Sequence, residues 1–219
     1  MKRLLLVILC FAQVLGLSLW GLYPGHVAAW LHRRPETAYP AESLPVILKS
    51  KGLPGRLSQA LLYVDKSDLT LTLYEGNIPL KTYRVAMGPN YLAGAKLREG
   101  DKRTPEGRYF ISEKRIVFPA DPLLGSRWLG ISYPLAKDVA RGYAEGIITG
   151  EEYRELMEMA GAGKLLPQKT PLGGEIGIHG GHREEKEATW TLGCIALTNR
   201  DVEELYPYIA VGTPIIIVP

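Results

Sequence analysis

The feature that most restricts the fold of this chain is an alternation of apolar and polar residues between positions 60 and 87. The alternation is clearest over 69–74, where leucines at the odd positions face one side of an extended chain and threonine or tyrosine at the even positions faces the other. Turn residues at 66–68 and 75–77 divide the stretch. The pattern predicts a β-meander whose third strand runs from about residue 78 to 87.

Further strand and helix signals follow along the chain. Alternating or apolar segments are expected to form strands at 108–118, 127–134, 173–181 and 213–218. The stretch 134–165 has helical spacing instead, with Thr149 and Glu152 placed as a capping box. Asn199 is placed to cap a helix that continues to about Ile209. These elements predict a single, mainly β domain with an α-helical insertion at 134–165.

Composition divides the chain into three parts. Residues 1–30 begin with two basic residues after the methionine and are uncharged from 4 to 23, as in a signal peptide or a membrane anchor. This length is close to the roughly 20 residues that span a bilayer, whereas small residues at 27–29 suit cleavage, so both interpretations stay open. Residues 31–58 are proline-rich and predict a tether. Residues 59–219 are then the folded domain, in the periplasm or elsewhere in the extracytoplasmic cell envelope.

The charge pattern offers no surface for a polyanion. The chain has 26 basic and 23 acidic residues, a net charge of +3, and these residues are scattered without long blocks. Nucleic-acid binding is therefore not expected. The small positive excess favours neither a membrane surface nor an anionic wall polymer as a partner.

Cys194 is the only cysteine of the predicted exported part, because Cys10 lies within the apolar N-terminal segment. It has no partner for an internal disulfide. A free thiol in an oxidising compartment is open to oxidation. Two interpretations follow: Cys194 is a buried small hydrophobe, or it is retained as a nucleophile.

A nucleophilic cysteine needs a nearby base. Two of the four histidines precede the folded domain, which leaves His179 and His182. His179 ends a predicted strand and is followed by Gly180 and Gly181, which would leave space for a substrate above the strand end. His182 enters a charged loop. We therefore predict His179 as the base for Cys194.

The residues before the thiol are candidates for substrate and oxyanion binding. Gly193 lacks a side chain where a peptide carbonyl must approach, and its N–H and that of Cys194 are candidate oxyanion donors. The alternative is a plain turn that requires a positive φ. Thr191 would hydrogen-bond His179 or the substrate, or be a strand residue facing solvent. Trp190 is expected to be a core or rim aromatic residue.

A zinc site is the competing chemistry. Three possible ligands lie close in the sequence: His179, His182 and Cys194. A fourth would come from one of three glutamates: Glu175, Glu184 or Glu185. Two histidines separated by two residues and followed by one distant cysteine match no common structural zinc pattern. We therefore predict no metal and no cofactor.

Two motifs together resemble the L,D-transpeptidase catalytic domain, the YkuD-like family of cell-wall cysteine enzymes. They are "IHGG" at 178–181 and "TLGCIALTN" at 191–199, and "LREGDKRTPEGRYFI" at 97–111 resembles a loop and strand of the same family. The similarity covers roughly residues 60–219. It implies a β-sandwich-like domain with a mixed sheet.

The resemblance also implies an activity in cell-wall biogenesis and cell shape. Cys194 would attack the carbonyl of an L-to-D peptide bond in a peptidoglycan stem peptide and form a thioester. His179 would activate the thiol and then handle the proton of the leaving or attacking amine. Thr191, Gly193 and the Cys194 N–H would shape the site.

Two positions depart from the family pattern and leave the fate of the acyl group open. Many members have a histidine two residues before the cysteine and an arginine two residues after it, where this chain has Leu192 and Ala196. An amine acceptor would make the protein a transpeptidase. Water would make it a carboxypeptidase, or an amidase that releases a wall-linked protein. His182 is a candidate replacement for the missing histidine, and a wall-binding module without catalysis is the alternative of another class.

Overall fold

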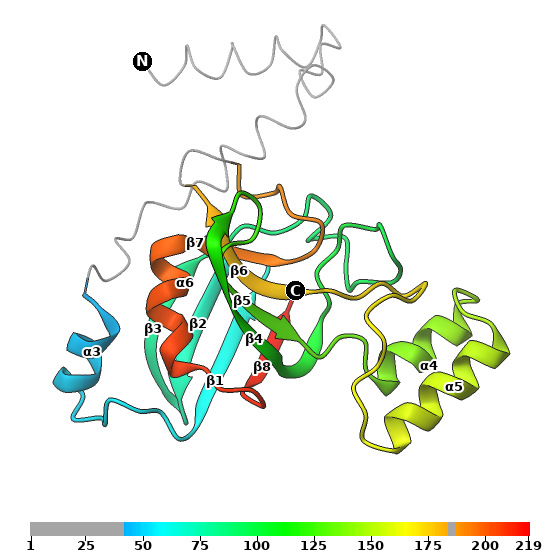
Figure 1. Cartoon of the computed structure of the whole chain (residues 1–219), viewed down its shortest axis with the longest axis horizontal. Coiled ribbons are helices and arrows are strands. Elements are labelled where there is room, and N and C mark those ends of the chain that lie inside the picture. The colour runs from blue at the N-terminus through cyan, green and yellow to red at the C-terminus, as the bar shows by residue number, and fades with distance from the viewer. Residues whose placement is uncertain (1–41, 184–186) are drawn as a thin grey trace, which may run out of the picture. The chain divides into compact units, whose positions relative to one another are not determined.

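The computed structural model describes residues 42–183 and 187–219 of the chain. Its strands form a mixed sheet in the order β3-β2-β1-β8-β4-β5-β6-β7 (Figure 1). The strands are β1 (Ala60–Asp65), β2 (Thr70–Glu75), β3 (Ile78–Arg84), β4 (Gly107–Asp121), β5 (Gly125–Ile131), β6 (Gly177–His182), β7 (Ile195–Thr198) and β8 (Pro214–Val218). The helices are α3 (Leu44–Ser50), α4 (Ala136–Ala144), α5 (Gly150–Gly161) and α6 (Asn199–Leu205), which continues into a 3₁₀ turn, Tyr206–Tyr208.

The predicted β-meander forms from β1, β2 and β3, which pair in antiparallel order. Leu71 and Leu73 of β2 are fully buried, as the alternation requires. Leu69 lies in the turn before β2, with a φ of 53°, and is outside the strand pattern. After β3 ends, Ala86 pairs with Ala196, just after the start of β7, so the two outer strands of the sheet are connected.

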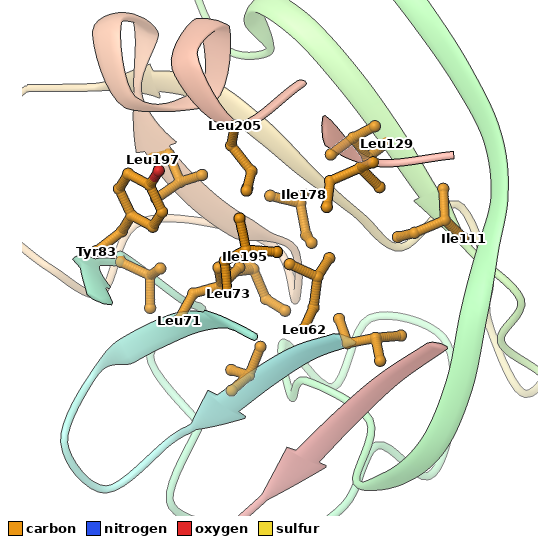
Figure 2. Packing of buried hydrophobic residues seen from close by; sticks show 14 of the residues in the cluster. Leu62, Leu71, Leu73, Tyr83, Ile111, Leu129, Ile178, Ile195, Leu197 and Leu205 are labelled. Atoms are coloured by element: carbon orange, nitrogen blue, oxygen red, sulfur yellow. The ribbon is translucent and has the colours of Figure 1, made fainter. Parts of the chain in front are cut away.

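Strand β4 connects the two halves of the sheet. Its first residues, 107–110, pair with β8, and its later residues, from Ile111 onward, pair with β5. The halves face each other across one apolar core (Figure 2), in which Leu62 and Leu71 lie opposite Ile178 and Ile195. This packing of two facing sheet halves confirms the predicted mainly β, sandwich-like fold with a mixed sheet.

The segment expected to be a proline-rich tether is partly folded. Helix α3 buries Leu44, Ile47 and Leu48 in the same core as the sheet. Pro45 lies in the first turn of this helix, where its missing N–H costs nothing, so the proline that suggested a tether starts the helix instead. The tether prediction is therefore wrong for 44–50.

The N-terminal predictions are not covered by the described residues. The signal peptide or anchor at 1–30, and 31–41 of the tether, lie outside them. Within 42–183 and 187–219, no helix combines the length and the apolar character needed to cross a membrane.

The helical insertion forms as α4 and α5, which lie together beside the sheet (Figure 1). They share a small apolar cluster that includes Val139, Ile148 and Leu156. The predicted capping box is present: Thr149 Oγ1 accepts the Glu152 N–H at 3.2 Å, and the Thr149 N–H donates to Glu152 Oε2 at 2.7 Å. The insertion therefore has a small apolar core of its own, separate from the core of the sheet.

Candidate active site

Cys194 lies at the end of a tight turn that leads into β7. Within this turn, Thr191 Oγ1 donates to the Cys194 carbonyl at 2.7 Å and accepts the Gly193 N–H at 3.2 Å. Thr191 is 3% exposed, so the structure supports neither the hydrogen bond to His179 nor the solvent-facing position expected for it. Its hydroxyl stabilises the turn instead.

Gly193 is required by the backbone of this turn. Its φ is 129°, and a Cβ there would lie 2.6 Å from the carbonyl oxygen of Arg103. The Gly193 carbonyl accepts a hydrogen bond from Thr104 Oγ1 at 3.0 Å. The positive-φ interpretation of Gly193 is therefore correct, and the loop at 103–104 packs directly against the turn that presents the thiol.

The surroundings of the Cys194 thiol favour its protonated form. The residue is half-buried, and its Sγ lies 3.5 Å from the Glu175 carbonyl oxygen, to which the S–H donates. Burial raises the pKa of the thiol to about 11, although the Gly177 N–H and the charge of Lys96 oppose the increase. A thiol with this pKa needs a base at neutral pH if it is to act as a nucleophile.

His179 lies on β6 in a cage of aromatic side chains. It is 2% exposed, stacks on Trp128 at 6.0 Å between ring centroids, and meets Trp190 edge-on at 5.9 Å. Its Nδ1 lies 2.7 Å from the Gly180 carbonyl oxygen. Because a carbonyl only accepts, Nδ1 carries the proton and Nε2 keeps a lone pair.

The environment of His179 favours the neutral imidazole. Burial lowers the pKa of His179 below its ordinary value, while the Gly180 carbonyl and the charge of Asp121 oppose that shift. A neutral imidazole is the form that can accept a proton. Asp121 is the last residue of β4, and its Oδ1 accepts the Leu123 N–H of the following turn at 2.7 Å.

Strand pairing places His179 on the strand next to the one that follows Cys194. Strands β6 and β7 are parallel neighbours in which Ile178 pairs with Ile195 and His179 with Ala196. Ile178 and Ile195 both point into the core (Figure 2). Because side chains alternate along a strand, His179 and its partner Ala196 lie on the opposite face, and Cys194 immediately precedes β7.

The two glycines after His179 do not leave space for a substrate as expected. Gly180 is buried, and a Cβ there would clash with Asn199 Oδ1. That oxygen accepts the Gly181 N–H at 3.0 Å and the Ser126 N–H at 3.1 Å. The space beside the glycines is thus filled by Asn199, and Gly180 contributes its carbonyl to His179 instead.

Asn199 does not cap α6, contrary to the prediction. Thr198 is the N-cap, and its Oγ1 accepts the Asp201 N–H at 3.1 Å. The Asn199 side chain is therefore available to connect β6 with the start of β5. Sequence reasoning missed this role because the bond to Ser126 joins positions 73 residues apart.

Trp190 connects the two candidate histidines. Its Nε1 donates to His182 Nδ1 at 3.3 Å, while its ring touches His179. Trp190 is half-buried, in agreement with a rim aromatic residue. His182 is also half-buried, at the end of β6, so it lies near the site.

The described residues contain no group of three metal ligands among their histidines, cysteines, aspartates and glutamates. Glu184 and Glu185 lie outside those residues. The absence of a metal cofactor stays a prediction.

Two further residues were not identified from the sequence: Lys96, whose charge acts on the thiol, and its partner Asp101. Lys96 is 3% exposed, and its ammonium pairs with Asp101 Oδ1 at 2.8 Å. Asp101 also accepts the N–H groups of Leu97 and Arg98. Only the resemblance of the segment 97–111 to a family loop pointed to this part of the chain.

These observations define a mainly β, mixed-sheet domain with a buried histidine on β6 and a cysteine in the turn that leads into β7, its parallel neighbour. The model of the YkuD family, the L,D-transpeptidase catalytic domain, matches residues 59–217. The chain belongs to this family, whose members are enzymes that act on peptidoglycan stem peptides. No curated protein matches the chain.

Solved structures of similar fold include Bd1075 from Bdellovibrio bacteriovorus, with 24% identity, a TM-score of 0.47, and coverage of 74% of this chain and 48% of that one. The helical cell shape determining protein Pgp2 from Campylobacter jejuni has 22% identity and a TM-score of 0.46, and the match covers 80% of this chain and 54% of Pgp2. An L,D-transpeptidase from Xylanimonas cellulosilytica has 14% identity, a TM-score of 0.42, and coverage of 75% and 63%. The chain thus spans about half to two thirds of the length of these relatives.

Proposed function

We propose that this protein is an exported cysteine acyltransferase that acts on peptidoglycan stem peptides, with Cys194 as nucleophile and His179 as base. The observation that carries the proposal is the hydrogen bond between His179 Nδ1 and the Gly180 carbonyl. It leaves Nε2 as the proton acceptor, on the strand that pairs with the one directly after Cys194.

The reaction begins with a neutral thiol and a neutral imidazole. Burial raises the pKa of Cys194 and lowers that of His179, so proton transfer accompanies attack on the substrate rather than preceding it. The sulfur bonds to the carbonyl carbon of the L-to-D peptide bond as His179 takes the thiol proton. The oxyanion that forms needs N–H donors. The Gly193 N–H is bonded to Thr191 Oγ1, so we assign this role first to the Cys194 N–H.

The tetrahedral intermediate then collapses to a thioester. The C–N bond of the former peptide breaks, and the leaving amine takes the proton held by His179. In the second half of the reaction an amine attacks the thioester, gives its proton to His179 and releases the thiol. This transfer is the L,D-transpeptidase reaction. Attack by water would give a carboxypeptidase or an amidase that releases a wall-linked protein.

Wall chemistry implies an extracytoplasmic site of action. The composition of residues 1–30 supports export by a signal peptide or retention by an anchor, which would make the membrane a partner. Detection of the intact or shortened N-terminus by mass spectrometry of protein from the cell envelope separates the two.

A non-catalytic wall-binding module is the second candidate function. The raised pKa of the Cys194 thiol favours it, because a buried, protonated thiol without an effective base is inert. It predicts a thiol that no stem peptide acylates.

The test uses the purified protein and defined muropeptides with tetrapeptide stems. Mass spectrometry should detect an acyl adduct on Cys194 that the Cys194→Ala variant lacks. Addition of an acceptor amine should convert the adduct to a cross-linked product, whereas water alone should yield a shortened stem if hydrolysis dominates. Unchanged muropeptides and no adduct, with Cys194→Ala indistinguishable from the natural protein, would reject catalysis.

A further inference from the structure

A charged groove lies beside the candidate active site. It has a volume of about 650 Å³ and is formed by the loop at 97–103 and by the connection between α4 and α5. Arg98, Glu99 and Arg103 line it from the loop, and Glu145 lines it from the connection. None of these four residues belongs to the Cys194–His179 pair.

The groove wall is in direct contact with the turn that carries the thiol. The Arg103 carbonyl oxygen limits the space at Gly193, where an added Cβ would lie 2.6 Å away. The next residue, Thr104, donates its hydroxyl hydrogen bond to the Gly193 carbonyl at 3.0 Å. A ligand held by the Arg103 side chain is therefore separated from the Cys194 turn by the backbone of a single loop.

The charges of the groove are not neutralised by one another. Across the described parts of the chain, no ion pair within 4.0 Å involves Arg98, Glu99, Arg103 or Glu145. Arg103 Nη1 has only a long contact, 3.5 Å, to a backbone carbonyl. Asp101, on the same wall, is already bonded to Lys96 and to backbone N–H groups. Two guanidinium groups and two carboxylates thus remain available to a ligand.

We propose that this groove binds a zwitterionic amino-acid end, in which an ammonium and a carboxylate are attached to one carbon. Guanidinium groups bind carboxylates through two parallel hydrogen bonds, which suits Arg98 and Arg103. The carboxylate of Glu145, on the opposite wall, accepts the ammonium. Such an end occurs in a free amino acid, including the D-alanine released by the proposed reaction, and on the diaminoacid of a stem peptide. The assignment of the ligand to these two sources rests on the proposed function. The inference that the groove binds a zwitterion does not depend on that function.

The test measures binding rather than turnover, in the full chain carrying Cys194→Ala. Titration calorimetry with D-alanine should detect binding that Arg98→Gln and Arg103→Gln each weaken about tenfold, the loss expected for one charge-assisted hydrogen bond. Glu145→Gln should weaken binding of D-alanine but leave binding of N-acetyl-D-alanine, which lacks the ammonium, unchanged. Arg200→Gln, which removes an exposed arginine of α6 outside the groove, is the matched control and should bind like the parent. Thermal unfolding of each variant checks that the fold is intact.

A tetrapeptide-stem muropeptide in the same titration distinguishes the sources. Tighter binding than that of D-alanine, with the same loss in the arginine variants, assigns the groove to the stem. Equal or weaker binding assigns it to the free amino acid. The proposal is overturned if neither probe binds, or if Arg98→Gln and Arg103→Gln bind as Arg200→Gln does. A protein that binds the zwitterion but never forms the Cys194 adduct would keep this site and lose the proposed function.

Discussion

The two halves of the candidate site are stabilised in different ways. The Cys194 half is a turn of four residues, 191–194, held by the hydroxyl of Thr191 within the turn and by a hydrogen bond from Thr104. The His179 half depends on distant side chains, with two tryptophans around the ring and Asn199 beside Gly180. The local motif supplies the hydroxyl and the glycine of the first half, whereas most contacts of the second half form only after the sheet has assembled. Substitutions in the two halves should therefore differ in how much they lower the free energy of unfolding.

Gly193→Ala should have the largest effect, because it forces a side chain into a positive-φ position against the Arg103 carbonyl. We expect a loss of about 3 kcal/mol in the free energy of unfolding, together with loss of the Cys194 adduct. The matched control is Gly212→Ala, where φ is 91° but no atom lies within 4 Å of the added Cβ. It should lose only about 1 kcal/mol. Equal losses in urea unfolding would contradict the close packing of the cysteine turn.

Asn199→Ala tests the half that depends on distant side chains. It leaves the Gly181 and Ser126 N–H groups without their acceptor, which should cost about 2 kcal/mol in urea unfolding. Asn199→Asp keeps an acceptor oxygen and, in the first turn of α6, should restore most of the stability. Asn77→Ala, in an exposed turn, is the control. If Asn199→Asp is no more stable than Asn199→Ala, the Asn199 oxygen does not have the role described.

Thr191→Val should have a smaller and more local effect. It removes the hydroxyl that bonds Gly193 and Cys194, at a cost of about 1 kcal/mol. Hydrogen exchange of the Gly193 amide should accelerate, and Thr191→Ser should return it to the natural rate. An amide that exchanges equally fast in all three proteins would show that the hydroxyl does not hold the turn.

The smallest expected effect is the contribution of His179 to the pH dependence of stability. Burial lowers the pKa of His179 below 6.5, so folding favours the neutral ring. Its stabilising contribution is fully present above pH 6.5 and is lost as the pH falls through the folded-state pKa. Urea midpoints measured between pH 7 and pH 5 should fall less in His179→Gln than in the natural protein, while His182→Gln should keep most of the dependence. If the urea midpoint of His179→Gln falls as much as that of the natural protein, the folded protein does not hold the His179 ring neutral.

The same contrast between local and distant contacts explains how far the sequence could be interpreted. The β-meander and the capping box at Thr149 were predicted because each depends on residues a few positions apart. Helix α3 was mistaken for a tether because its burial depends on the folded sheet. The role of Asn199 was missed for the same reason, since it connects segments that meet only in three dimensions.

The central claim is that His179 takes the proton of Cys194, and the rate of Cys194 acylation as a function of pH tests it most directly. With a tetrapeptide-stem muropeptide, the rate of adduct formation should rise with pH through a pKa below 6.5 and then level off. His179→Gln should lower the plateau at least about 100-fold, whereas His182→Gln should leave its pH dependence in place. A rate in His179→Gln equal to that of the natural protein, or one that keeps rising toward the thiol pKa of about 11 in both proteins, would contradict the account.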